Sequence, residues 1–227
     1  MTTRKVFLVA GAAADGSAAT ACASDSAAKE PFASFAFDQA RFASMLGKPA
    51  RHRQCFGAAQ IAGGDVLRQM LNSMNAYEYT LKEGSGAMHA AAVLYHGHVV
   101  ALGMNDRAWN ELVIPAIPKM SEPMRKGMPA GLKPGSGNPY WHESKIKSPQ
   151  YDASIEALVL RRASFFICNN ALVGTANVIA TALGKHQAEV YKQLAASTVP
   201  GSLLVPAGVM AINACQDARF TYIQATL

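Results

Sequence analysis

The stretch Ser164-Phe-Phe-Ile-Cys-Asn-Asn-Ala-Leu-Val-Gly174 decides the fold expected for this chain. Residues 164–167 form a short, mostly apolar and aromatic run, which is typical of a buried strand. A helix is expected to follow from about Leu172 to Leu183, and Gly184 is suited to end it. A buried strand that runs at once into a helix favours an α/β fold.

Strands and helices alternate through most of the chain. Further strands are expected, from apolar runs between turn residues, at 51–61, at 87–104 with a break at Gly97, at 202–206 and at 220–224. Helices are expected, from apolar spacings of three and four and from capping residues, after Asp38, from an N-cap at Asp65 to Leu81, at 107–114 up to Pro115, through 155–162, at 186–194 and at 209–216. Such alternation predicts a mostly parallel sheet with helices on both faces.

Composition limits the classes of protein to consider. The 227 residues are 50% hydrophobic and 16% charged, so the chain can bury a sizeable core and is not globally disordered. No linker separates two comparable blocks, so we expect one domain, 50–227, with extensions. The formal net charge of +6 is mild and is not gathered in a dense basic stripe, so no nucleic-acid partner is expected.

The amino terminus has the features of a secretory signal peptide. A basic start, Met1–Lys5, precedes a short run of apolar and small residues, 6–14, and small-x-small cleavage sites follow. We therefore assign 1–23 to a signal peptide and 24–49 to an amino-terminal extension, which predicts a periplasmic or secreted protein. Alternatively, 5–10 is the first strand of a cytoplasmic protein. No other segment approaches 18 uninterrupted apolar residues, so stable membrane insertion is not expected.

The four cysteines are scattered, at Cys22, Cys55, Cys168 and Cys215, and none forms a C-x-x-C pair. This spacing disfavours structural zinc. Up to two disulfides, in three possible connectivities, remain open if the protein is exported. The chain also lacks a phosphate-binding loop, a serine nucleophile elbow and a catalytic carboxylate pair, so no cofactor is expected.

Residues 115–150 change character. They hold seven of the eleven prolines, four glycines and six Lys or Arg residues against two Glu, and so carry most of the net positive charge. We interpret this Pro-rich basic segment as an insertion in the domain. It could form a lid over an anionic ligand, an arm that reaches a neighbouring subunit, or a solvated loop.

Cys168 is the leading candidate for chemistry. It lies at the carboxyl end of a predicted strand and at the amino end of a helix, where open α/β sheets bind ligands. The N–H groups and dipole of a helix amino terminus favour a thiolate, which is the nucleophilic form of cysteine. The alternative is that Cys168 is a small buried apolar residue.

The chain resembles the DsrE/DsrF-like family of small sulfur-relay proteins over roughly 50–114 and 150–225. The resemblance lies in 164–174, in Leu204-Val-Pro-Ala-Gly-Val-Met-Ala-Ile-Asn-Ala-Cys-Gln216, in Phe220-Thr-Tyr-Ile223 and in Val93-Leu-Tyr-His-Gly97. It implies a flavodoxin-like three-layer sandwich, assembly into homotrimers or homohexamers, and a persulfide on Cys168. Its partners would be a protein that donates or accepts sulfur, or a small sulfur anion.

The sequence departs from the family pattern in two places, and one is the segment 115–150, which is longer than a minimal family domain would carry. Arg219 stands where the family tends to have glycine after the last helix. An arginine would be strained there if the position requires a positive φ.

Several residues could shape a pocket around Cys168. His96 ends the expected strand before Gly97 and could polarise a substrate, while Asn169 and Asn170 follow the cysteine directly. Asp106 and Trp109 come shortly after that strand, although an N-cap and a core anchor are their simpler roles.

These residues support three hypotheses about function. The first is a sulfur-handling or thiol-reactive protein that carries sulfur on Cys168. The second is a non-catalytic structural or small-ligand-binding homo-oligomer. The third is a metal-dependent enzyme that uses His96 and His98 with His89 or Cys168.

Overall fold

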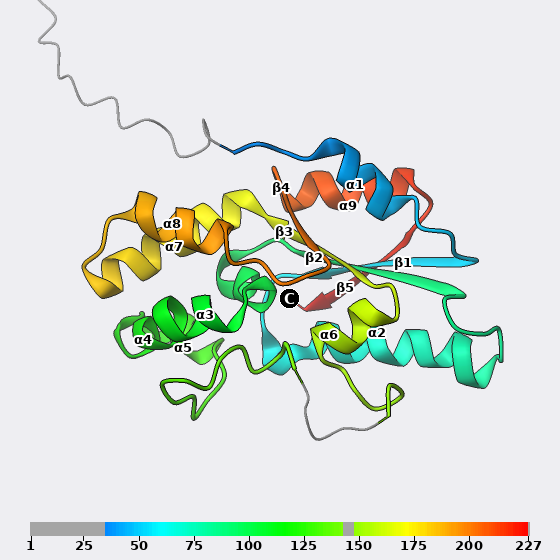
Figure 1. The fold of residues 1–227 in the computed structure, drawn as a ribbon, viewed down its shortest axis with the longest axis horizontal. Helices are drawn as coiled ribbons and strands as arrows, with labels where there is room; N and C mark the ends of the chain where they lie inside the picture. The colour runs from blue at the N-terminus through cyan, green and yellow to red at the C-terminus, as the bar shows by residue number, and fades with distance from the viewer. Residues whose placement is uncertain (1–34, 143–147, 227) are drawn as a thin grey trace, which may run out of the picture. The chain divides into compact units, whose positions relative to one another are not determined.

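A parallel sheet lies at the centre of the fold (Figure 1). The computed structural model describes residues 35–142 and 148–226, so the signal peptide proposed at 1–23 lies outside the described residues. The strands are β1 (His52–Ala58), β2 (Met88–Leu94), β3 (Ser164–Cys168), β4 (Ser202–Val205) and β5 (Thr221–Thr226), in the order β4-β3-β2-β1-β5. All neighbouring strands are parallel, which confirms the predicted α/β fold.

Helices cover both faces of this sheet (Figure 1). One face packs against α2 (Asp65–Asn75), α6 (Ile155–Leu160), α7 (Asn169–Leu183) and α8 (Gln187–Ala195). The other face packs against α1 (Gln39–Leu46) and α9 (Gly208–Asp217). No helix within the described residues is long and apolar enough to cross a bilayer.

The two faces of the sheet are built from alternate residues of the same strands. In β3, Phe165 and Ile167 join the core beneath α7, whereas Phe166 belongs to the core beneath α1 and α9. The ring of Phe42 in α1 meets the ring of Phe166 edge-on, with centroids 5.0 Å apart. Part of the segment assigned to an amino-terminal extension, 24–49, therefore covers the sheet.

Two predicted boundaries in the middle of the chain are wrong. The strand expected at 87–104 ends at Leu94, and Gly97–Gly103 is a 3₁₀ helix that begins with a positive φ at Gly97. The helix expected to stop at Pro115 continues past it to Lys119, through α3 (Asp106–Ala108), a π turn (Trp109–Val113), α4 (Ile114–Ala116) and a 3₁₀ turn (Ile117–Lys119). In the interior of an α-helix the ring of Pro115 would clash with the backbone of the preceding turn, and the wider π turn relieves this clash.

Smaller shifts affect other helices. The N-cap of α2 is Gly64, in a left-handed conformation, and Asp65 is the first helical residue. A π turn (Ala76–Thr80) extends α2, and the expected cap at Asp38 is confirmed, since its side chain accepts a hydrogen bond from the Arg41 N–H.

The Pro-rich segment at 115–150 is anchored by Asn138. Its Nδ2 donates to the carbonyl oxygens of Leu102 at 2.9 Å and Met104 at 2.6 Å, and its N–H donates to Asp106 Oδ1 at 2.8 Å. A short helix, α5 (Glu122–Lys126), lies earlier in the segment. The described part of the segment therefore contacts the domain through specific hydrogen bonds.

A buried histidine marks the amino end of the sheet. His89 is 2% exposed, its Nε2 lies 3.0 Å from Ser164 Oγ, and that oxygen accepts a hydrogen bond from Lys48 Nζ at 3.0 Å. Burial, together with the positive charges of Lys48, Arg53 and Arg162, lowers the pKa of His89 to about 3.

His89 should make stability depend on pH. Between about pH 6.5 and pH 3 the unfolded chain binds a proton at this histidine that the folded chain does not, so stability should fall as pH falls. The difference in unfolding free energy between wild type and His89→Gln should shrink by up to about 1.4 kcal/mol per pH unit over this window, measured by urea unfolding. His186→Gln, at an exposed position, is the control; equal pH dependence in all three proteins would contradict the prediction.

Arg219 adopts the conformation that the sequence suggested would be costly. Its φ is +66°, directly after α9 and its C-cap, Ala218. Because a left-handed conformation costs an L-residue about 1–2 kcal/mol and glycine much less, Arg219→Gly should stabilise the protein by about 0.5–1 kcal/mol in chemical denaturation. Ala218→Gly is the matched control, since Ala218 has an ordinary φ of −81° and should lose stability. A loss of stability in Arg219→Gly would contradict this account.

Candidate functional site

Cys168 is both the last residue of β3 and the N-cap of the 15-residue helix α7. Its Sγ accepts a hydrogen bond from the N–H of Ala171 at 3.4 Å. The side chain is buried, with 4% exposed. The sulfur therefore lies where the amino end of α7 stabilises negative charge, as the sequence predicted.

Beside Cys168, the connections that follow two adjacent strands change from one face of the sheet to the other. Cys168 pairs with Val205 at the carboxyl end of β4. The chain leaves β3 into α7 on one face and leaves β4 into α9 on the other (Figure 1). Two adjacent strands whose following helices lie on opposite faces create the crevice in which open α/β sheets bind ligands.

The first turn of α9 fits tightly against the end of β2. A Cβ placed on Gly208 would lie 2.0 Å from the Cβ of Tyr95, so only glycine fits there. The hydroxyl of Tyr95 donates to Gln224 Oε1 at 2.9 Å, in β5. The Ala207-Gly208 turn therefore brings α9 close to the carboxyl end of the sheet.

The two asparagines after Cys168 occupy different environments. Asn169 is buried, and its Oδ1 accepts a hydrogen bond from the Tyr191 hydroxyl at 2.7 Å, which joins α7 to α8. Asn170 is exposed on the first turn of α7. Asn169 therefore has a structural partner, whereas Asn170 is available to a ligand.

His96 is exposed at the turn after β2, and α7 contacts this turn. Thr175 Oγ1 of α7 hydrogen-bonds to the carbonyl oxygen of Gly97 at 2.9 Å. The neighbouring His98 packs against Gly127, and burial and the charge of His96 lower its pKa. The fold thus brings the His96 turn to the helix that begins at Cys168.

Asp106 and Trp109 take part in other interactions. Asp106 accepts from Asn138 in the Pro-rich segment, and Asn105 rather than Asp106 is the N-cap, through its side chain. Trp109 is fully buried and donates from Nε1 to the carbonyl oxygen of Ala101 at 2.8 Å. Their hydrogen bonds therefore anchor the domain core and the Pro-rich segment rather than Cys168.

The described residues include no group of three or more His, Cys, Asp or Glu side chains placed to hold a metal ion. His89 and His96 lie at opposite ends of β2, because the first is its second residue and the second follows its last. The His and Cys residues named in the metal hypothesis are therefore not gathered in one site.

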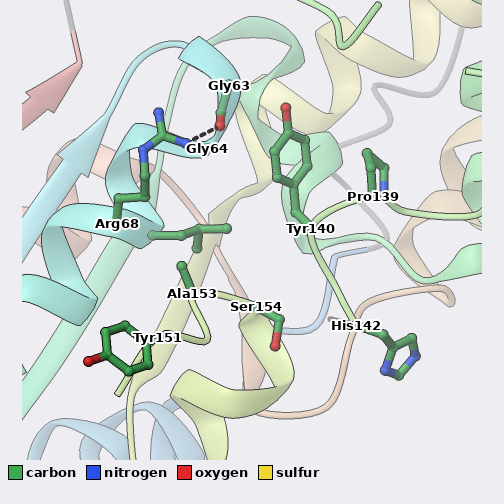
Figure 2. Close-up of a pocket in the computed structure, with 10 residues that line it drawn as sticks. Gly63, Gly64, Arg68, Pro139, Tyr140, His142, Tyr151, Ala153 and Ser154 are labelled. Atoms are coloured by element: carbon green, nitrogen blue, oxygen red, sulfur yellow. Dashed lines mark hydrogen bonds between the residues drawn. The ribbon is translucent and has the colours of Figure 1, made fainter. Parts of the chain in front are cut away.

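A cavity of about 200 Å³ lies elsewhere, between the start of α2 and the end of the Pro-rich segment (Figure 2). Its lining residues come from these two segments and from the residues that lead into α6, and are Gly63, Gly64, Leu67, Arg68, Pro139, Tyr140, His142, Tyr151, Ala153 and Ser154. Sequence reasoning missed this cavity, although Gly63-Gly64 after a strand and Tyr140-Trp141-His142 in a basic segment were separate signals.

Arg68 and Tyr140 form two of the walls of this cavity (Figure 2). Arg68 Nη1 donates to the carbonyl oxygen of Gly63 at 2.7 Å, and its guanidinium also pairs with Asp65. The Tyr140 ring lies on Gly64, where a Cβ would come within 2.9 Å of Tyr140 Cε1. Burial raises the pKa of Tyr140, so its hydroxyl stays protonated and can donate at neutral pH.

His142 lies on the side of the cavity formed by the Pro-rich segment. Its Nδ1 is 2.8 Å from Glu156 Oε2, and its Nε2 is 4.0 Å from Asp106 Oδ2. The cavity therefore combines apolar walls with hydroxyl, imidazole and guanidinium groups, a mixture common in small-molecule sites.

Comparison of the chain with protein-family models, with curated proteins and with solved structures finds no match in any of the three.

Proposed function

We propose that this protein handles sulfur through Cys168, in a DsrE-like version of the α/β fold with the Pro-rich segment as an insertion. One observation carries the proposal. Cys168 caps α7 at the ends of two strands, β3 and β4, whose following helices lie on opposite faces of the sheet, and its sulfur accepts a hydrogen bond from the Ala171 N–H. A thiol in that position accepts a hydrogen bond at a helix amino terminus and lies at the sheet edge where open α/β sheets bind ligands.

The proposed reaction is the transfer of one sulfur atom. The Cys168 thiolate attacks the terminal sulfur of a small polysulfide anion or of a persulfide on a donor protein. A new S–S bond forms on Cys168 while the S–S bond of the donor breaks, and the donor keeps the electron pair as the shortened polysulfide or as a thiolate. The proton lost by Cys168 passes to solvent or to His96, which is exposed at the neighbouring turn.

Access to Cys168 requires a local opening, because only 4% of this residue is exposed. The Pro206-Ala207 connection and the first turn of α9 are the elements next to it. Val209 in that turn is 68% exposed, so little packing opposes its movement on the outer side. A small sulfur anion, or a sulfur atom at the end of a donor's chain, would need the smallest opening.

Assembly and export are parts of the same proposal. Val209 on α9 is an exposed apolar side chain, and the edge strand β5 exposes Tyr222 and Ile223, so this strand is the contact we propose for a homotrimer or homohexamer. The basic and apolar start of the sequence supports export to the periplasm or beyond.

Treatment of the reduced protein with inorganic polysulfide should add one sulfur atom to Cys168. Peptide mass mapping should find the persulfide on wild type and on Cys55→Ala, but not on Cys168→Ala. Unfolding curves would show that Cys168→Ala remains folded, with a cost on the order of 1 kcal/mol. A folded wild-type protein whose Cys168 stays unmodified, or is modified no more than the other cysteines, would refute the proposal.

The cavity beside Tyr140 favours a second candidate function, the binding of a small ligand without chemistry. The cavity has apolar walls from Leu67, Pro139 and Ala153, and polar groups from Tyr140 and Arg68. A volume of about 200 Å³ suits a single aromatic or heteroaromatic ring with one or two polar substituents.

Substitution of Ala153 by leucine should fill this cavity. Ligand-observed NMR with a library of single-ring aromatic fragments should give binders to wild type that lose most of their affinity for Ala153→Leu. Ala196→Leu, at an exposed position on the C-cap of α8, is the matched control and should bind the same fragments. Binding that survives in Ala153→Leu would exclude the cavity as the site.

A further inference from the structure

Cys55 and Cys215 form a pair of thiols in the core, apart from Cys168. Cys55 is the middle residue of β1, and Cys215 lies in the last turns of α9. Both are fully buried, in the core between the sheet and the helices α1 and α9. Both thiols lie in one buried cluster on the face of the sheet where α9 packs on β1, and Cys215 raises the pKa of the Cys55 thiol, so the two side chains are neighbours.

The packing of α9 on the sheet explains why these two residues meet. α9 lies across β1, β2, β3 and β5, and Ala211, one turn before Cys215, is buried on the same side of the helix. Cys55 is flanked in the sheet by Ala91 of β2 and Tyr222 of β5. Ala91 belongs to the same buried cluster as Cys55 and Cys215.

We propose that Cys55 and Cys215 are a disulfide-forming pair that links β1 to α9 when the chain folds in an oxidising environment. The two residues are 160 positions apart in the sequence, so the bond would close most of the domain into one covalent loop. The proposal is independent of any chemistry at Cys168, which lies on a different strand and helix.

The oxidant would be a disulfide such as oxidised glutathione or the disulfide of a thiol oxidase. One cysteine thiolate attacks the oxidant, which forms a mixed disulfide and releases one thiolate. The second cysteine then loses its proton, attacks the protein sulfur of the mixed disulfide and releases the second thiolate. Two protein thiols become one S–S bond, and one molecule of oxidant is reduced to two thiols.

The native environment should make this reaction slow once the protein has folded. The neighbouring Cys215 side chain and burial raise the pKa of the Cys55 thiol, so the reactive thiolate is rare. Oxidation therefore needs α9 to leave the sheet, or it takes place before α9 packs. The bridge would form during folding, whereas protein that has folded in the reduced state would keep its thiols.

Refolding the full chain tests this inference. Reduced protein in guanidinium is diluted into a glutathione buffer with excess oxidised glutathione, free thiols are blocked, and cysteines are mapped by mass spectrometry without reduction. The expected product is a linked Cys55–Cys215 peptide with Cys168 labelled as a free thiol. Native reduced protein in the same buffer should form the link at least about tenfold more slowly, because its thiols are buried.

Variants and heating complete the test. Cys215→Ala should abolish the link and leave Cys55 free, whereas Cys168→Ala should retain it, whether or not Cys168 carries sulfur. Reduction of the bridged wild type should lower its Tm by about 5–10 °C. Refolded wild-type protein in which Cys55 and Cys215 are both free, or in which either is bonded mainly to another cysteine, would overturn the proposal.

Discussion

The structure depends on burying both faces of a parallel sheet. All seven residues of β2 are buried, and its run Met88-His-Ala-Ala-Ala-Val-Leu94 is apolar on both sides apart from the buried His89. Such a strand is stable only when helices cover it above and below. The connections from β1 through β4 place their helices on one face, so the other face depends on α1 and on the single crossover helix α9.

The return of the chain from β4 to β5 therefore has several effects. It makes α7 and α9 leave the adjacent strands β3 and β4 toward opposite faces of the sheet, beside Cys168. It places Cys215 over Cys55, and it brings Gly208 against Tyr95. The connection into α9 thus follows the strand that pairs with Cys168, and the last turns of α9 carry Cys215, one of the two thiols proposed to form a bridge.

The sequence predicted the order of strands and helices better than the sites. The strand β3 could be found from local patterning, because its apolar run, Phe165-Phe-Ile167, is short and is followed at once by a helix. The end of β2 was misplaced because apolar residues continue through Val99–Leu102, and an unbroken apolar run does not distinguish a strand from a buried 3₁₀ helix. The Tyr140 cavity and the Cys55–Cys215 contact join residues distant in sequence, so neither has a local pattern.

The anchoring of the Pro-rich segment at Asn138 has a consequence for how the chain can vary. The side-chain amide of Asn138 is bound to the carbonyl oxygens of Leu102 and Met104, and this divides one long connection into two shorter ones. Because the entropy of closing a loop rises only slowly with its length, residues could be added or lost before Asn138 at little cost to the sheet. This single amide would then allow the surface formed by the earlier part of the Pro-rich segment to diversify while the core and the cavity remain unchanged.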